Sequence, residues 1–270
     1  MSNPTIVYAS DHSPSVLSVH QWRTISNSVP YIKPYLTTPT LKILDVGCGP
    51  GSITVDLAKH VPQGHVTGVE YTPEPLVQAR ALAASQNVQN VDFTVGDIHQ
   101  LEFEDGSFDL VHAHQVLQHV ADPVRALREM RRVTKKGGYV CVRESAAKLW
   151  FPASEGMAKW NELVLAVGRA KGSNPDPGSW IHVWAHEADF EWEAIKCSAG
   201  TWCFRTVEER KWWADSFIGR VTEGKFREFA VEGGHATIEE LDEIAKTWRE
   251  WKDREDGWFS ILHGEIVCQV

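Results

Sequence analysis

The chain has 270 residues, of which 43% are hydrophobic and 23% charged, enough to bury a substantial core as one large domain. Its formal net charge of −9 argues against a nucleic-acid partner or an anionic membrane, because both would repel a broadly acidic surface. No apolar run is long enough to cross a bilayer and the first residues lack the pattern of a secretory signal, so we expect a cytoplasmic protein without a membrane partner.

Residues 13–36 predict one or two helices, and from residue 41 strand and helix patterns alternate. The predicted strands are 41–47, 65–70, 91–97, 108–116 and 139–145. The predicted helices between them are 52–61, 73–87 and 122–135, with Ser52 and Asp122 as caps and Gly137-Gly138 after the last. This alternation is typical of parallel βαβ units with helices on both faces of a sheet.

Beyond residue 145 the pattern changes, and all but one of the 12 tryptophans lie at or after position 150. Helices are predicted at 155–172, 182–190, 206–221 and 237–254, and strands at 190–204 and 258–270. We therefore expect an α/β fold, a doubly wound and mostly parallel sheet, with N-terminal helices and helical cap insertions after strand five. Residues 1–270 would form a single domain, divided into an N-terminal helical lid (1–40), a ligand-binding βαβ half (41–145) and a part that adds cap helices and completes the sheet (146–270).

The five cysteines are odd in number and no pair has C-x-x-C spacing. This pattern predicts reduced thiols, with neither a disulfide framework nor a metal site.

The first predicted strand ends in the sequence LDVGCGPG, which places Gly47, Gly49 and Gly51 within five positions. Glycines at the carboxyl end of a parallel strand let a ligand approach the backbone, and the following helix N-terminus favours an anionic group. The dinucleotide pattern G-x-G-x-x-G is not met, because Ser52 occupies its last position, and a phosphate-binding GK[ST] sequence does not follow. The turn alone could also serve only to reverse the chain.

Two acidic residues follow the glycines at successive strand ends. Glu70 ends the second strand, where a carboxylate can accept hydrogen bonds from both ribose hydroxyls. Asp97 follows Gly96 at the end of the third strand, where it could bind the exocyclic amine of a base. Either acid could be an ordinary turn residue, but the ordered set favours a nucleoside.

With these motifs the sequence resembles the class I S-adenosylmethionine-dependent methyltransferases over about residues 40–145. The motifs that carry the resemblance are LDVGCGPG, VTGVEYT, VGDIHQLEFEDGSFDLVHAHQVLQHVADP and LREMRRVTKKGGYVCV. Within this family it is similar to the small-molecule group of ubiquinone and menaquinone biosynthesis. SPSVLSVHQWRT and AGTWCFRTVEERKWW also resemble fungal secondary-metabolite methyltransferases, among them the gliotoxin bis-thiomethyltransferases.

The resemblance implies S-adenosylmethionine as cofactor, S-adenosylhomocysteine as product and no metal. Asp45 and the loop from Gly47 through Gly49 to Gly51 would hold the methionine end of the cofactor. Glu70 would bind the ribose, and Tyr71 would lie beside the adenine.

The same resemblance assigns the remaining cofactor contacts. Asp97, following Gly96, and the backbone of Ile98 would read the adenine amine. His114 and Gln115 would lie under the sulfonium and face the substrate. Arg23 is a candidate to pair with the cofactor carboxylate from the N-terminal lid, since arginine can grip a carboxylate with two hydrogen bonds; a surface arginine is the alternative.

Methyl transfer needs alignment and exclusion of water more than a fixed catalytic triad. A proton must still leave the acceptor, and the histidines of HAHQVLQH are candidates to take it. We expect His114 to be the base, His119 to face the substrate pocket and His112 to be structural. A thiol would need the least help, because its pKa of about 8.5 leaves it partly ionised at neutral pH.

Two interpretations fit the tryptophan-rich part. Trp160, Trp212, Trp213, Trp248 and Trp251 have helical spacing and are expected in a core. Alternatively, an insertion at about 145–178 forms a substrate lid, with aromatic walls from Trp150 and Phe151 and from Trp180 or Trp184.

The sequence thus predicts a monomeric methyltransferase acting on a small molecule, with a secondary-metabolite dithiol such as reduced gliotoxin as the first candidate acceptor. Methylation of oxygen, nitrogen or carbon on a quinone-like metabolite stays open. A non-catalytic, cofactor-binding regulatory protein and, more remotely, a nicotinamide oxidoreductase are the alternatives from other classes.

Overall fold

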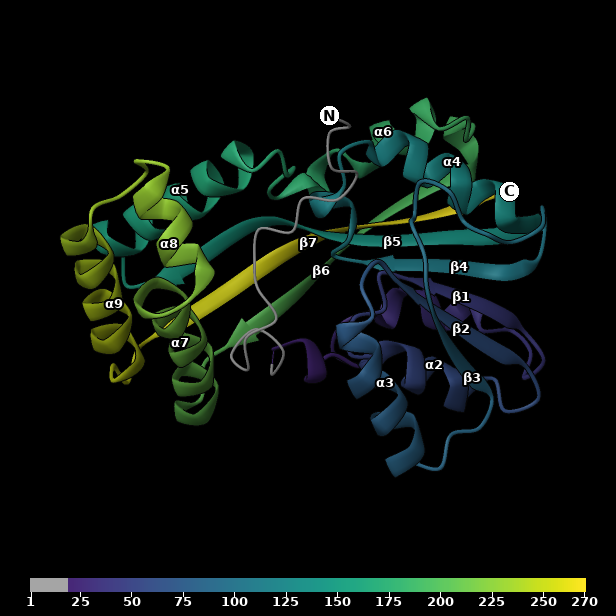
Figure 1. Ribbon diagram of the computed structural model, residues 1–270, viewed down its shortest axis with the longest axis horizontal. Helices are drawn as coiled ribbons and strands as arrows, with labels where there is room; N and C mark the ends of the chain where they lie inside the picture. The colour runs from purple at the N-terminus through teal and green to yellow at the C-terminus, as the bar shows by residue number, and fades with distance from the viewer. Residues whose placement is uncertain (1–18) are drawn as a thin grey trace.

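The computed structural model describes residues 19–270. In this part of the chain one seven-stranded sheet has the order β3-β2-β1-β4-β5-β7-β6 (Figure 1). The strands are β1 (Lys42–Val46), β2 (His65–Glu70), β3 (Val91–Val95), β4 (Phe108–His114), β5 (Thr134–Phe151), β6 (Ile195–Phe204) and β7 (Trp258–Gln269). Strands β1 to β5 pair in parallel, while β7 runs antiparallel to both β5 and β6. The strand order reverses between β1 and β4, which is where open α/β sheets bind ligands.

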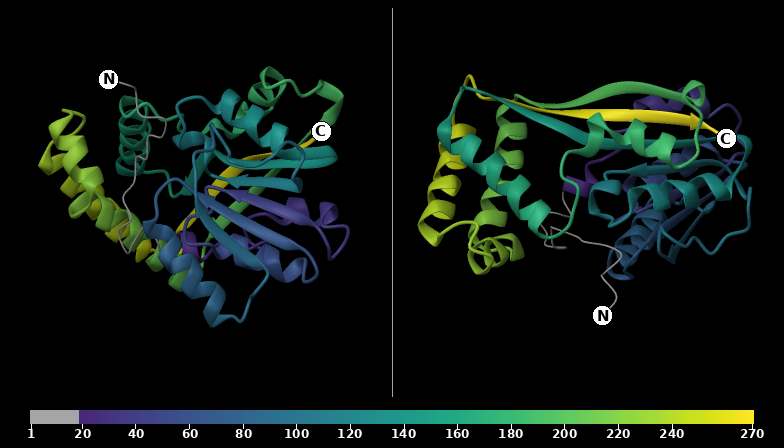
Figure 2. Two further views of the ribbon diagram at one scale, coloured as in Figure 1. Left: turned by 45° about the vertical axis from the view of Figure 1, so that its right-hand side comes forward. Right: turned by 90° about the horizontal axis from the view of Figure 1, so that it is seen from above.

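Helices cover both faces of the sheet, as the alternating pattern predicts (Figures 1 and 2). The α-helices are α2 (Ser52–His60), α3 (Glu74–Ser85), α4 (Pro123–Val133), α5 (Glu155–Ala170), α6 (Ile181–Glu187), α7 (Val207–Thr222), α8 (Lys225–Glu232) and α9 (Ile238–Lys252). Short 3-10 helices are η1 (Pro30–Tyr35), η2 (Leu117–His119), η3 (Pro177–Ser179) and η4 (Trp192–Ala194).

Side chains of the central strands alternate between two hydrophobic cores. On β1, Leu44 joins the core beneath α4 and α6, whereas its neighbour Ile43 joins the core beneath α2 and η1. The same period of two along β4 places Val111 in the first core and Leu110 in the second. The doubly wound, mostly parallel fold expected from the sequence is confirmed.

A third core lies outside the doubly wound part, where long strands leave the main sheet. Figures 1 and 2 show β5, β7 and β6 running into a lobe formed by α5, α7, α8 and α9, which we call the aromatic lobe. Its core contains Trp160, Trp213, Trp248 and Trp251 as buried side chains, with Trp212 packed against it. The expectation that these tryptophans are core residues is confirmed.

The predicted caps meet different outcomes. The Asp122 side chain accepts from the Arg125 N–H at the start of α4, as expected. Ser52 does not cap α2, because its hydroxyl donates to the carbonyl of His20 and the cap position is Gly51. The expectation for Ser52 was therefore wrong: Gly51, in the left-handed conformation, occupies the cap position, and Ser52 is the first residue of the helix.

Strand β5 is far longer than its apolar centre predicts. It starts at Thr134, inside the segment predicted to end a helix, and it continues to Phe151, inside the predicted cap insertion. Helix α8 was not expected. Within residues 19–270, no helix combines the length and apolarity that crossing a membrane would require.

Candidate active site

A cavity opens at the carboxyl ends of β1, β2 and β4, where the strand order reverses. Its walls come from four groups of residues: the N-terminal segment, the turn after β1 with the start of α2, the ends of β2 and β3 with the turns that follow, and the loop after β4. The lining residues are His20, Arg23, Asp45, Val46, Gly47, Cys48, Gly49, Pro50, Ser52, Ile53, Val69, Glu70, Tyr71, Thr72, Pro75, Gly96, Ile98, His114, Gln115, Val116, Gln118, His119 and Val120.

The glycine turn requires its glycines for two different reasons. All three have positive φ angles, of 66° at Gly47, 52° at Gly49 and 78° at Gly51, which side chains rarely adopt. A Cβ at Gly47 would lie 2.4 Å from a methyl carbon of Val116, so this glycine allows close packing with the loop after β4. A Cβ at Gly49 would meet no atom within 4 Å. Because Gly49 lines the cavity, that open space belongs to the site.

Glu70 lies directly across from the glycine turn. Its Oε2 accepts from the Gly49 N–H at 2.9 Å, and its Oε1 accepts from the Tyr71 N–H at 2.8 Å. The Tyr71 side chain is 42% exposed next to this carboxylate. The end of β2 thus presents an acid and an aromatic ring at the rim of the cavity.

Asp45 is buried beneath the turn and holds three elements together. Its Oδ2 accepts from the Thr54 hydroxyl of α2 at 2.6 Å, and its Oδ1 lies 2.7 Å from Nδ1 of His112 on β4. Both Asp45 oxygens therefore have partners within the protein. His112 is buried and hydrogen-bonded, in agreement with its expected structural role.

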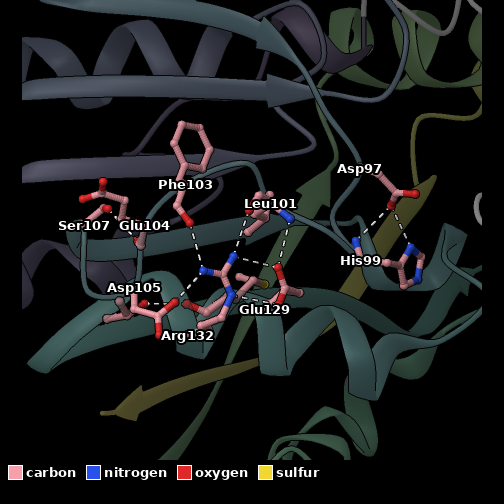
Figure 3. Close-up of polar contacts among 11 residues, drawn as sticks. Asp97, His99, Leu101, Phe103, Glu104, Asp105, Ser107, Glu129 and Arg132 are labelled. Carbon is pink, nitrogen blue, oxygen red and sulfur yellow. Dashed lines mark hydrogen bonds and ion pairs between the residues drawn. The ribbon is translucent and has the colours of Figure 1, made fainter.

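Asp97 stands beside the cavity without lining it. Its Oδ1 accepts from the His99 N–H at 2.9 Å and lies 2.8 Å from the His99 ring nitrogen Nδ1, as Figure 3 shows. The neighbouring residues Gly96 and Ile98 do line the cavity. The Asp97 carboxylate thereby fixes the turn that carries both of them.

The loop after this turn is fastened to α4 by one arginine (Figure 3). The Arg132 guanidinium donates to the carbonyls of Leu101 and Phe103 and to the carboxylates of Glu129 and Asp105. The hydrogen bond from Arg132 holds the pKa of the Glu129 carboxyl below its usual range. Because Glu129 also accepts from the Leu101 N–H, Arg132 and Glu129 together hold the loop that follows the cavity-facing turn.

Two histidines face the cavity from β4 and the loop after it. His114 is 6% exposed and, among residues 19–270, neither ring nitrogen has a hydrogen-bond partner. Burial, and next the charge of Arg23, lower the pKa of His114 well below its usual value. The same two causes lower the pKa of His119 to about 4. Both rings are therefore neutral at neutral pH and can accept a proton, although weakly.

Gln115 connects the cavity to a buried group of polar residues. It has a φ of 55°, and its Oε1 accepts from Nη2 of Arg23 at 2.8 Å. Its Nε2 lies 3.0 Å from Nε2 of His263 on β7, whose Nδ1 lies 3.0 Å from Nη2 of Arg143 on β5. His263 and Arg143 are buried, and sequence reasoning missed both, since strand patterns do not show which polar residues meet across a sheet.

The structure brings most of the predicted site residues together around one cavity. Those that line it are Arg23, Asp45, Gly47, Gly49, Glu70, Tyr71, Gly96, Ile98, His114, Gln115 and His119. His20 and Gln118 also line it and were not predicted; the only sequence signal was that they are polar members of the motifs HQWRT and HAHQVLQH.

The expected aromatic walls are placed elsewhere. Trp150 and Phe151 lie at the far end of β5 in the aromatic lobe, where the Phe151 ring is 53% exposed. Trp180 and Trp184 stack on one another at α6, with ring centroids 6.3 Å apart. None of these four lines the cavity, and the aromatic lobe contributes no lining residue in the described chain. The long strand β5 carries Trp150 and Phe151 away, because the chain does not turn at residue 145.

Comparison with known proteins identifies the family. Residues 37–213 match the family model described as a methyltransferase domain. An uncharacterized methyltransferase of Schizosaccharomyces pombe is 38% identical over 280 residues, covering 99% of this chain and 98% of the relative. The demethylmenaquinone methyltransferase of Staphylococcus aureus is 42% identical over 142 residues, covering 52% of this chain and 58% of the relative.

Solved structures agree on the fold. The crystal structure of a putative methyltransferase from Bacillus halodurans superimposes with a TM-score of 0.58 at 19% sequence identity, covering 89% of this chain and 97% of the other.

Proposed function

The chain belongs to the methyltransferase-domain family, and from this premise we propose that it transfers a methyl group from S-adenosylmethionine to a small organic molecule. The observation that carries the proposal is one cavity lined by the glycine turn, Glu70 and Ile98, which follow β1, β2 and β3, and by His114, which ends β4 on the other side of β1. An adenosine moiety along the first side would place its sulfur substituent toward the second.

The residues present fit this cofactor. The open space at Gly49 leaves room for a ligand against the backbone, and the Glu70 carboxylate at the end of β2 suits ribose hydroxyls. The apolar side chain of Ile98 and the exposed ring of Tyr71 suit the faces of an adenine. When bound, the cofactor supplies a methyl group activated by a positively charged sulfur.

The side chains around the acceptor end would orient the acceptor, exclude water and accept one proton. Val116 and Val120 provide apolar surface in the loop after β4, and Gln118 provides hydrogen bonds. His114 is the proposed proton acceptor, because it lines the cavity and has no partner within the described chain for either nitrogen.

The acceptor we propose is a thiol, with a secondary-metabolite dithiol such as reduced gliotoxin as the specific candidate. The lowered pKa values of His114 and His119 support this proposal. A hydroxyl acceptor depends on such a base for its deprotonation, whereas a thiol with a pKa of about 8.5 is already partly ionised at neutral pH and can react beside a weak one.

A second candidate acceptor is a quinone-like carbon or oxygen nucleophile. The 42% identity to the demethylmenaquinone methyltransferase of Staphylococcus aureus favours it, since it extends over 52% of this chain.

Methylation assays with labelled S-adenosylmethionine test both candidates. Purified protein would be offered reduced gliotoxin, simple dithiols, phenols, naphthoquinols and amines, with Glu70→Ala as the binding-deficient control. We expect label in the dithiol products. Turnover of phenols or naphthoquinols with no product from any dithiol would overturn the thiol proposal, and binding without any turnover would favour a non-catalytic role.

A further inference from the structure

A row of four polar side chains runs from the cavity wall into the buried centre of the sheet: Arg23, Gln115, His263 and Arg143. We propose that Arg143 and His263 fix the direction of hydrogen bonding in this row, so that Gln115 donates its amide N–H into the cavity, beside Arg23, to the carboxylate of the cofactor. The inference rests on the proposed function, because it names the part of the cofactor bound here.

The direction starts at Arg143, which is 1% exposed. A guanidinium can only donate hydrogen bonds, so Nδ1 of His263, 3.0 Å from Nη2 of Arg143, must accept. Burial lowers the pKa of His263 to about 2, and this ring is therefore neutral, with a single N–H. That hydrogen is on Nε2, because Nδ1 is the acceptor.

Besides the backbone of Ile261, Gln115 is the group that can offer an acceptor to His263. The end of its amide lies 3.0 Å from Nε2 of His263, and the oxygen and nitrogen of an amide are assigned from the hydrogen bonds they make. With Nε2 of His263 donating, the amide oxygen of Gln115 turns toward the histidine. The amide N–H group then turns toward the cavity and Arg23.

This leaves two donors facing each other at the cavity wall. With the amide oxygen toward Arg23, the 2.8 Å contact with Nη2 is a hydrogen bond; with the amide reversed, both groups donate and each needs another acceptor. A carboxylate placed beside both groups in the cavity accepts from each of them, and charge-assisted bonds of this kind are the stronger ones. Arg23 and Gln115 line the same cavity as the glycine turn, whose neighbourhood would receive the amino-acid end of the cofactor.

The buried end of the row cannot reverse its direction, because the Arg143 guanidinium has donors and no acceptor. Arg143 is paired with Glu265, with 3.4 Å between Nε and Oε1, and Glu265 also accepts from the Ser198 hydroxyl. Both guanidinium groups contact the Trp202 ring, whose centroid lies 5.3 Å from the Arg23 guanidinium carbon and 5.4 Å from that of Arg143.

The variant Gln115→Glu tests the direction without any ligand. A carboxylate at this position can accept from His263 and from Arg23 at once. The side chain of the variant then supplies to Arg23 the acceptor that the cofactor carboxylate supplies in the wild type. We expect the melting temperature of the ligand-free protein to rise by roughly 2–4 °C, as a gain of one strong hydrogen bond would produce in a domain of this size. A fall in melting temperature would overturn the proposal.

Calorimetric binding of two ligands tests the identity of the anion. S-adenosylhomocysteine carries the amino-acid carboxylate, and methylthioadenosine lacks it. We expect Gln115→Glu to lower the affinity for S-adenosylhomocysteine by about tenfold or more and to leave the affinity for methylthioadenosine unchanged. Equal weakening of both ligands, or of neither, would overturn the assignment. Wild-type protein that binds neither ligand would contradict the proposed function instead, while the melting temperature of Gln115→Glu would still report on the direction.

A matched pair at His263 separates direction from packing. In His263→Gln the longer amide can still donate to Gln115, whereas in His263→Asn the shorter amide can accept from Arg143 but does not reach Gln115. We expect S-adenosylhomocysteine to bind His263→Gln within about threefold of the wild type and His263→Asn about tenfold more weakly. The same loss in both variants at unchanged melting temperature would contradict a positioning role for the Nε2 donor.

Discussion

Nδ1 of His112 lies 2.7 Å from Oδ1 of Asp45, and the two residues are direct partners in the register of β4 against β1. The other carboxylate oxygen accepts from Thr54 of α2. One buried side chain thus joins two strands and a helix directly below the glycine turn. The family resemblance assigns Asp45 to cofactor binding, whereas in the structure both of its carboxylate oxygens bind protein groups below the glycine turn.

Substitution of Asp45 should therefore affect stability as well as ligand binding. Asp45→Ala leaves two buried donors without their acceptor, and we expect the free energy of unfolding to fall by about 2–4 kcal/mol. Asp45→Asn keeps one acceptor oxygen and should cost about 1 kcal/mol. Urea unfolding measures both values. A stability equal to the wild type in Asp45→Ala would show that these hydrogen bonds contribute nothing.

Two glycines offer a matched test of the cavity. Gly49 and Gly137 both have positive φ, and at both a Cβ would meet no atom within 4 Å, but only Gly49 lines the cavity. Alanine at either position should cost about 1 kcal/mol of stability through backbone strain.

The two alanine variants should differ in binding. We expect Gly49→Ala to weaken S-adenosylhomocysteine by at least about tenfold, because its methyl group enters ligand space, and Gly137→Ala to bind as the wild type does. Titration calorimetry provides the comparison. Similar affinities for both variants would place the ligand away from the turn.

Much of the fold could be predicted because local patterns agree with it. The capping boxes at Thr206 and Thr237 begin α7 and α9 where Thr and two acidic residues are found in the sequence. The length of β5 could not be predicted, since its ends Thr134 and Phe151 are polar or exposed and pair with β4 and β7 only through tertiary contacts. Hydrophobic periodicity in a sequence indicates which residues are buried, and pairing with neighbouring strands can extend a strand beyond its buried residues.

The site was predictable where it follows strand ends in order, as Gly49 and Glu70 do. It was not predictable where partners are distant in sequence: the row from Gln115 to His263 spans 148 positions. The prediction that Trp150 forms a wall of the cavity was wrong for a related reason: the direction of β5 beyond residue 145 decides where Trp150 lies, and the sequence does not show that direction.

Glu144 should give the stability an unusual pH dependence. Its side chain is fully buried on β5, and Oε1 accepts from the N–H groups of Val116 and Leu117 in the cavity loop. Burial raises the pKa of Glu144 to about 8, against an ordinary value of 4.5. Between these values the folded protein holds a proton that the unfolded chain has lost, so stability falls as pH rises from about 4.5 to about 8 and is level above that range.

The variant Glu144→Gln isolates this contribution. The amide keeps the acceptor for both N–H groups and cannot ionise. We expect the wild type to lose about 3–5 kcal/mol more than the variant between pH 5 and pH 9. Urea unfolding at several pH values gives the difference curve, and parallel curves for the two proteins would mean that Glu144 is ionised throughout.

Asp97 can act on adenine directly or through the turn it holds. We expect Asp97→Ala to weaken the binding of S-adenosylhomocysteine by about 1–3 kcal/mol, the cost of removing a partly buried hydrogen-bonding group. His99→Phe removes the ring nitrogen but retains the carboxylate and its bond to the backbone N–H at position 99. If the carboxylate reads the base, His99→Phe should bind nearly normally in calorimetry; equal losses in both variants would assign Asp97 to the turn alone.

His114 provides a test of the chemistry. We expect His114→Phe to keep the affinity for S-adenosylhomocysteine within about threefold, since the ring shape is retained and no polar bond is lost. The turnover number should respond to the acceptor, falling by about 10²-fold or more for a phenol and by at most about tenfold for a thiol, because only the phenol depends on a base.

His119→Phe, assayed alongside, shows whether the second cavity histidine shares this role.

The pH dependence of turnover gives a second measurement. Burial and the charge of Arg23 keep the pKa of His114 low, so the activity of the wild-type protein toward a phenol should not decline until the pH falls well below 6.5. A loss of turnover in His114→Phe that is the same for thiol and phenol would contradict proton acceptance and point to a role in placing the acceptor.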